Sequence, residues 1–158
     1  GKPETPDQEA DFQFLDWAAK LHEIGISVAH NGYHKHGAYI LTFADMPGFS
    51  KKDQARLALL VFGHRGKLEK ITALPIGDPH WKLLCALRLA TLFHRSRDGV
   101  PLPSFRMRAL ADGFLLELQN DWLANHPLTA VALSEETTAW QRVGQVLLIK
   151  HRNLERDA

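Results

Sequence analysis

The spacing of apolar residues changes close to residue 99, and this change constrains the fold more than any other feature of the chain. Before it, apolar residues such as Phe12, Leu15 and Ala19 recur every three or four positions, the spacing of an amphipathic helix. After it, apolar and polar residues alternate, as they do in strands with one buried face. We therefore predict a mostly α protein, with a helical domain at residues 1–98 and a small α+β C-terminal subdomain at residues 99–158.

Capping residues and prolines mark four helices in the first of these domains. Thr5–Gln8 has the order of a capping box with proline at the first helical position. Ser50 followed by Asp53, and Asp78 followed by Pro79, mark two further helix starts. The predicted helices cover, in order, residues 6–24, 36–44, 51–64 and 81–95.

A β-hairpin is expected at the start of the second domain. Asp112-Gly113 is a strong two-residue turn signal, because type I′ turns need residues that tolerate positive φ. Apolar residues alternate with polar ones on both sides of it, from Phe105 to Ala109 and from Phe114 to Leu118. Further along the chain we expect helical segments at residues 121–124 and 135–143 and a third strand at residues 145–150.

The composition is that of a folded, soluble protein. Of 158 residues, 45% are hydrophobic and 23% are charged. Apolar runs such as Leu57–Phe62 are far shorter than the ~20 residues that span a bilayer, and no secretory signal begins the chain. The single cysteine, Cys85, excludes an internal disulfide, so we expect a cytoplasmic protein. The net charge of +1 gives little support for a nucleic acid partner.

Histidines gather between residues 22 and 36. His22 is followed by Glu23, and His30, His34 and His36 come next, so that four of the nine histidines of the chain fall in this stretch. Imidazole is the commonest metal ligand, and a histidine with a carboxylate at a helix end, facing further histidines, could hold a metal ion and a phosphate. His22, Glu23, His34 and His36 are therefore candidate metal ligands.

Several strings of residues resemble a known family. They are Leu21-His22-Glu23-Ile24-Gly25, the histidine-rich stretch, Gly37-Ala38-Tyr39-Ile40-Leu41, Asp45-Met46-Pro47-Gly48-Phe49 and Leu87-Arg88-Leu89-Ala90, continuing to Arg97. In this order they resemble the histidine-aspartate (HD) phosphohydrolase fold. More narrowly, they resemble the C-terminal half of the exopolyphosphatase and guanosine pentaphosphate phosphatase family. The resemblance is strongest over residues 15–97 and implies an HD-like helical domain, truncated at its N-terminus.

The resemblance also implies a function. In that family catalysis belongs to N-terminal actin-like domains that bind Mg²⁺ and cleave terminal phosphates, so we expect no catalytic residue and no cofactor in this chain. Its expected partners are inorganic polyphosphate, its own N-terminal catalytic domains and a second copy in a homodimer. The leading expectation is the polyphosphate-binding and dimerisation module of an exopolyphosphatase, which releases terminal phosphate from inorganic polyphosphate. Within the family, guanosine pentaphosphate stays open as the other substrate of the whole protein. The expected polyphosphate-binding residues are Lys35, Arg88, His94, Arg95 and Arg97.

Departures from the HD pattern indicate a degenerate metal centre. Glu23 stands where the metal-active members have aspartate, Thr91 stands where a liganding aspartate would follow, and a further histidine would precede residue 1. Under a structural interpretation the histidines cap helix ends and pack the core, and Arg88 is buried beside an acid such as Glu23. Arg95 would likewise favour a helix C-terminus without any ligand. A metal-dependent phosphohydrolase that acts on a nucleotide through the candidate ligands is the alternative function.

Overall fold

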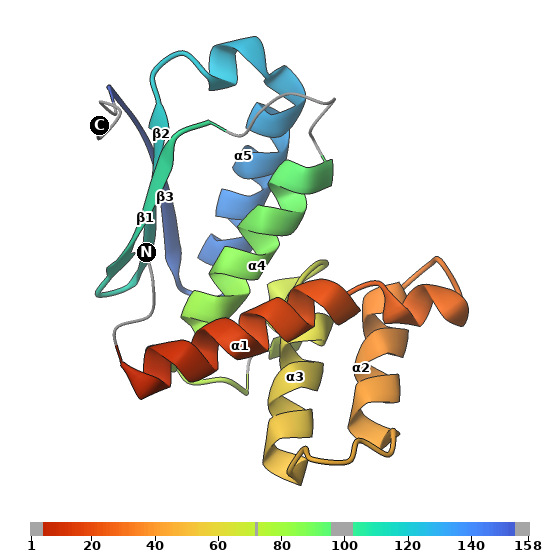
Figure 1. Cartoon of the computed structure of the whole chain (residues 1–158). Coiled ribbons are helices and arrows are strands. Elements are labelled where there is room, and N and C mark those ends of the chain that lie inside the picture. Colours follow the sequence, from red (N-terminus) through yellow and green to blue (C-terminus); the bar gives the residue numbers. More distant parts are fainter. Residues whose placement is uncertain (1–4, 72, 96–102, 154–158) are drawn as a thin grey trace. The chain divides into compact units, whose positions relative to one another are not determined.

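The structure is a computed structural model that describes residues 5–71, 73–95 and 103–153. It is mostly helical with one small sheet, which confirms the predicted fold class. In chain order the elements are α1 (Pro6–Leu21), the 3₁₀ helix η1 (Ile24–Ser27), α2 (Tyr33–Phe43), α3 (Lys51–Gly63), η2 (Leu68–Ile71), α4 (His80–Arg95), β1 (Phe105–Leu110), β2 (Gly113–Gln119), η3 (Leu123–Asn125), α5 (Pro127–Arg142) and β3 (Val146–Arg152) (Figure 1).

Contacts divide the chain into two compact units. Unit 1 comprises residues 1–66 and 86–88, and unit 2 comprises residues 67–85 and 89–158. The predicted domain boundary at residue 98 falls in the segment 96–102, which lies outside the described residues, so this division into domains stays a prediction.

Unit 1 is built from α1, α2 and α3, which enclose an apolar core. Leu57, Leu60 and Val61 line one side of α3 at the helical spacing and are fully buried. Ala18 of α1 and Leu41 of α2 are buried as well. Burial of a leucine side chain contributes about 1.5–3 kcal/mol, because apolar surface is removed from water. Since α3 supplies three fully buried apolar side chains, it is the main apolar element of this unit.

Caps fix where the helices of unit 1 begin. The Thr5 hydroxyl accepts a hydrogen bond from the amide of Gln8 at 3.2 Å. Ser50 and Asp53 form a complete capping box, in which the Ser50 hydroxyl donates to the Asp53 carboxylate at 2.6 Å and accepts from the Asp53 amide at 3.1 Å. The hydrogen bond from the Ser50 side chain lowers the pKa of Asp53 below its ordinary value of 3.8. Gly32 caps α2 in the left-handed region, with φ of 67°.

Unit 2 contains a three-stranded sheet in the order β1-β2-β3. β1 and β2 form the predicted antiparallel hairpin, but the predicted turn at Asp112-Gly113 was wrong by one residue. Gly113 already pairs with Leu110, so the turn is Ala111-Asp112, and neither Asp112 nor Gly113 has a positive φ. β3 then pairs with β2 in parallel, Phe114 opposite Leu147. Parallel neighbours need a crossover connection, which α5 provides.

The core of unit 2 lies between the sheet and two helices. Trp140 of α5 is fully buried and contacts the rings of Trp81 from α4 and Phe114 from β2, at centroid distances of 5.6 and 5.5 Å. At the far end of α4, Phe93 stacks on Phe105 of β1 at 6.2 Å. These contacts place α4 and α5 on the same face of the sheet, as Figure 1 shows.

Three predicted helix boundaries were wrong, and one of them is the start of α2, which lies at Tyr33 and not at residue 36. The first helix ends at Leu21, and residues 24–27 form a 3₁₀ turn, because the backbone of Gly25 lies directly against α2. The last helix begins at Pro127, eight residues before the predicted start at Glu135, because proline occupies its first turn. In the described part of the chain, no helix has the length and apolar character that crossing a membrane requires.

Candidate functional site

Histidines at the ends of α1 and α3 lie against each other in unit 1. The ring centroids of His22 and His64 are 5.2 Å apart, and that of His34 on α2 lies 6.4 Å from His64. The ring of Tyr33 is also close, at 5.6 Å from His64. Three helices therefore bring His22 and His34 to a common neighbour. We refer to His22, His34 and His64 as the histidine group.

Sequence reasoning did not include His64 among the candidate site residues. The signal was available, because His64 follows Leu57, Leu60 and Val61 at the spacing of a buried helical stripe. His64 is in fact 1% exposed, so it belongs to the core of unit 1.

The hydrogen bonds of the histidine group fix the proton positions of two rings. Nδ1 of His22 donates to the carbonyl oxygen of Ala19 at 2.6 Å, and Nδ1 of His64 donates to that of Val61. Because a carbonyl oxygen can only accept, each Nδ1 carries a hydrogen, and in the neutral ring Nε2 keeps the lone pair. Nε2 of His22 lies 3.7 Å from Oε1 of Glu23. Both rings thus cap the carbonyl ends of their own helices.

The other two candidate ligands are more exposed than His34 and His64. The Glu23 side chain is 63% exposed, and His36 is half-buried on α2. Among residues 5–71, 73–95 and 103–153, no group of three or more histidine, cysteine, aspartate or glutamate side chains is arranged to hold a metal ion. A tightly held transition metal usually takes at least three protein ligands. We derive no metal-dependent step from this arrangement.

Arg88 is buried in unit 1 at the end of α3. It is 6% exposed, and its guanidinium donates to the carbonyl oxygens of Gly63 at 2.9 Å and Gly66 at 3.0 Å. These carbonyls follow the last turn of α3, where the helix leaves its acceptors unsatisfied and carries partial negative charge. Arg88 therefore anchors the end of α3, and little of its side chain is open to a ligand.

The remaining predicted phosphate-binding residues are on the surface where the structure describes them. Lys35 is exposed on α2 in unit 1. His94 and Arg95 are exposed in the last turn of α4 in unit 2, where the helix dipole also favours positive charge. Arg97 lies outside the described residues.

A pocket of about 150 Å³ lies in unit 2, between the segment that leads into α4 and the turn of the hairpin. Asp78, Lys82 and Asp112 are its charged lining residues, and Ile76 and Leu110 are among its apolar ones. Burial alone would raise the pKa of Asp78. Hydrogen bonds from the backbone and the ring of His80, at 2.8 and 2.7 Å, outweigh it and hold the pKa below the ordinary 3.8. Asp78 is therefore an ionised cap at neutral pH, as its helix-start position suggested.

Comparisons with known proteins identify the family of the chain. The sequence model of the Ppx/GppA phosphatase family, domain III, matches residues 2–137. The chain belongs to this family. Among its relatives, a guanosine-5'-triphosphate,3'-diphosphate pyrophosphatase of Pseudoalteromonas translucida (strain TAC 125) is 35% identical over 138 residues, which are 85% of this chain and 28% of the relative. A protein of the same name from Vibrio atlanticus (strain LGP32) is 34% identical over 141 residues, 86% of this chain and 28% of the relative.

The chain thus spans little more than a quarter of the length of these Ppx/GppA relatives. Family membership confirms the predicted resemblance.

Proposed function

We propose that this chain is the C-terminal module of a Ppx/GppA phosphatase, which holds the phosphate chain of the substrate and pairs with a second copy. Hydrolysis, with its Mg²⁺, is assigned to N-terminal domains that this chain does not contain, and the protein is proposed to be cytoplasmic. The observation that carries this proposal is the family match over residues 2–137, combined with coverage of only 28% of the relatives. Most of the length of each relative lies outside the matched region, and we assign the phosphatase reaction to that part.

Two substrates are open to the whole protein, and the relatives favour one. Both relatives described above are named as pyrophosphatases of guanosine-5'-triphosphate,3'-diphosphate, which favours guanosine pentaphosphate. Inorganic polyphosphate is the second candidate. Guanosine pentaphosphate and inorganic polyphosphate both carry consecutive phosphates joined by anhydride bonds, so a module that binds a phosphate chain would serve either reaction.

Exposed cations are the groups that we assign to this grip. Lys35, His94 and Arg95 are on the surface, and Arg97 is added from the resemblance alone. Arg88 contributes indirectly, because it anchors the end of α3. Cationic side chains recognise phosphates through charge and hydrogen bonds, and each phosphate they neutralise releases counterions.

Binding of polyphosphate to the purified chain tests the grip. We expect affinity to rise with the length of the polyphosphate and to fall steeply with salt. Charge reversal of Lys35 and Arg95 to glutamate should weaken binding at least about tenfold. Reversal of Arg142, which is exposed at the end of α5, is the matched control and should have a much smaller effect. Unchanged binding in the double variant would count against the assignment.

Activity of the parent protein, with and without this module, tests the division of labour. Phosphate release from guanosine pentaphosphate and from long-chain polyphosphate should be seen only when the N-terminal domains are present, and loss of the module should raise KM more than it lowers kcat. Sedimentation of the chain tests dimerisation, which predicts twice the monomer mass. Manganese-stimulated phosphate release by the chain alone, abolished by His22→Ala, would instead support the metal-dependent phosphohydrolase.

A further inference from the structure

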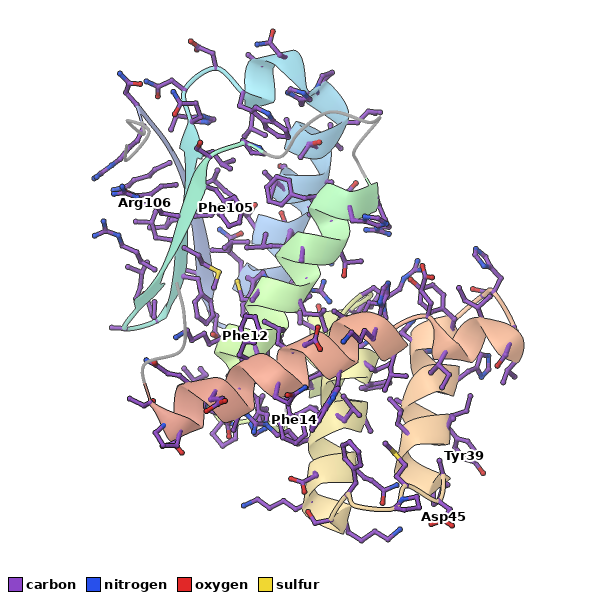
Figure 2. The ribbon with its side chains drawn as sticks, viewed as in Figure 1. Phe12, Phe14, Tyr39, Asp45, Phe105 and Arg106 are labelled. Carbon is purple, nitrogen blue, oxygen red and sulfur yellow. The ribbon has the colours of Figure 1, made fainter. Side chains whose placement is uncertain are left out.

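The face of the sheet turned away from α4 and α5 carries a band of cations. Strand residues alternate between faces, so Phe114, Leu116 and Leu118 point towards the helices and are buried. Glu117 lies between them on the opposite face. In the register of the sheet, Arg106 of β1 is directly opposite Glu117. Figure 2 shows Arg106 projecting from β1 on the side away from Phe105.

β3 adds two further cations to this face. Lys150 is opposite Glu117 on the β3 side, and Arg152 comes two residues later on the same face. Arg108, two residues after Arg106 on β1, completes the set. We call Arg106, Arg108, Lys150 and Arg152, which surround Glu117 on three strands, the sheet band.

Glu117 organises two arginines of the sheet band. Its side chain is 1% exposed, and its carboxylate meets Nε of Arg152 at 2.9 Å and Nε of Arg108 at 3.7 Å. Both ion pairs use the Nε side of the guanidinium. The Arg108 and Arg152 side chains remain 59% and 57% exposed, which leaves their terminal Nη groups accessible to a ligand. The carboxylate therefore forms a close ion pair with Arg152 and a longer contact with Arg108. Both guanidinium groups lie on an open surface, where their planar donors suit phosphate oxygens.

The charge of the sheet band exceeds what Glu117 requires. Four cations surround one carboxylate, whereas the whole chain has a net charge of only +1. With strands ~4.8 Å apart and a rise of ~3.3 Å per residue, the band extends roughly 16 Å from Arg108 to Arg152. Charged side chains also protect sheet edges from aggregation, and that role accounts for single cations on β1 or β3. Edge protection does not explain why cations from both β1 and β3 surround one buried carboxylate.

We propose that the sheet band binds an inorganic phosphate chain, laid diagonally across the three strands. A phosphate chain carries negative charge on every unit, so it can meet cations spread over this length, and guanidinium groups match phosphate oxygens in geometry. This inference rests on the proposed function and deepens it, because it assigns a phosphate-chain surface that is separate from Lys35, His94 and Arg95. The sheet band belongs to unit 2 alone.

A triple substitution on the exposed cations of the sheet band tests the inference. Arg152 is kept, because it pairs with Glu117 at the shorter distance. Binding of tripolyphosphate, long-chain polyphosphate and single-stranded DNA of similar length is measured at several salt concentrations, with circular dichroism as the check on folding. The test variant is Arg106→Gln, Arg108→Gln and Lys150→Gln, and the matched control, which removes three exposed cations of unit 2 outside the band, is Lys67→Gln, Lys82→Gln and Arg142→Gln.

We expect the test variant to bind long-chain polyphosphate at least about tenfold more weakly than the wild type. The slope of log K against log salt concentration should become shallower by about 2–3. The control should change affinity by less than about twofold. Arg106→Gln alone, a small change on an exposed strand, should give about a threefold loss. Equal binding by the test variant and the wild type would overturn the inference and leave the proposed function standing. Tighter binding of DNA than of polyphosphate would overturn the ligand assignment. A wild-type chain that binds no phosphate chain would overturn both proposals.

Discussion

Replacement of Arg88 by methionine separates a role in the fold from a role in binding. Arg88 is 6% exposed, and its guanidinium donates to two carbonyl oxygens at the end of α3. Each hydrogen bond from a charged donor contributes about 1.5 kcal/mol, so Arg88→Met should reduce the free energy of unfolding by about 3 kcal/mol. For a chain of this size, that loss lowers Tm by about 6–12 °C. Arg88→Lys keeps the charge but cannot reach both carbonyls, so we expect about half the loss.

Urea unfolding followed by far-ultraviolet circular dichroism measures these losses, and polyphosphate binding is measured on the same variants without urea. Lys82→Met is the matched control, since Lys82 is exposed in the first turn of the same helix and should change stability by less than about 0.5 kcal/mol. An Arg88→Met protein with the stability of the wild type but no affinity for polyphosphate would refute this reasoning and return Arg88 to the ligand site.

Three other changes follow from the local geometry. Gly25→Ala should destabilise the protein by at least about 2 kcal/mol, because a Cβ there would lie 1.9 Å from a backbone oxygen of α2. Gly32→Ala has open space around it and should cost only the ~1 kcal/mol of a non-glycine residue in the left-handed region. Urea unfolding compares the two variants. Ser50→Ala removes half of a capping box and should cost about 1 kcal/mol in the same assay. Hydrogen bonds from His80 hold the pKa of Asp78 below 3.8, so the ionised carboxylate stabilises the fold above that pH, and this stabilisation is lost as the pH falls through the folded-state pKa. Asp78→Asn should therefore flatten the pH dependence of the free energy of unfolding between about pH 5 and 2. An unchanged pH dependence would contradict the assignment.

Local signals in the sequence predicted much of the fold. The Ser50 cap acts through neighbouring backbone groups, and α3 begins where it indicates. The hairpin also forms, but its turn is Ala111-Asp112, one residue before the predicted Asp112-Gly113. The end of α1 could not be found in this way. Gly25 lies against α2, and that contact depends on a segment folded next to it and not on its immediate neighbours.

The candidate site was only partly accessible to sequence reasoning. The clustering of His22 and His34 in the sequence reflects proximity in space, but their common neighbour His64 comes from a helix thirty residues away. For Arg88, burial was foreseen as one interpretation, with a carboxylate as its partner. Two of its acceptors are backbone carbonyls, and such acceptors carry no residue-specific signal. Alternation predicted the hairpin, but only the register of three strands brings cations together around Glu117.

The parallel pairing of β2 with β3 has a consequence for biosynthesis. β2 ends at Gln119 and its partner begins at Val146, so during translation β2 leaves the ribosomal exit tunnel before β3 does. In that interval one edge of β2 lacks its hydrogen-bonding neighbour, next to Leu116 and Leu118, which are fully buried in the finished protein. The nascent chain therefore passes through a stage in which an unfinished sheet exposes a strand edge that can recruit other chains.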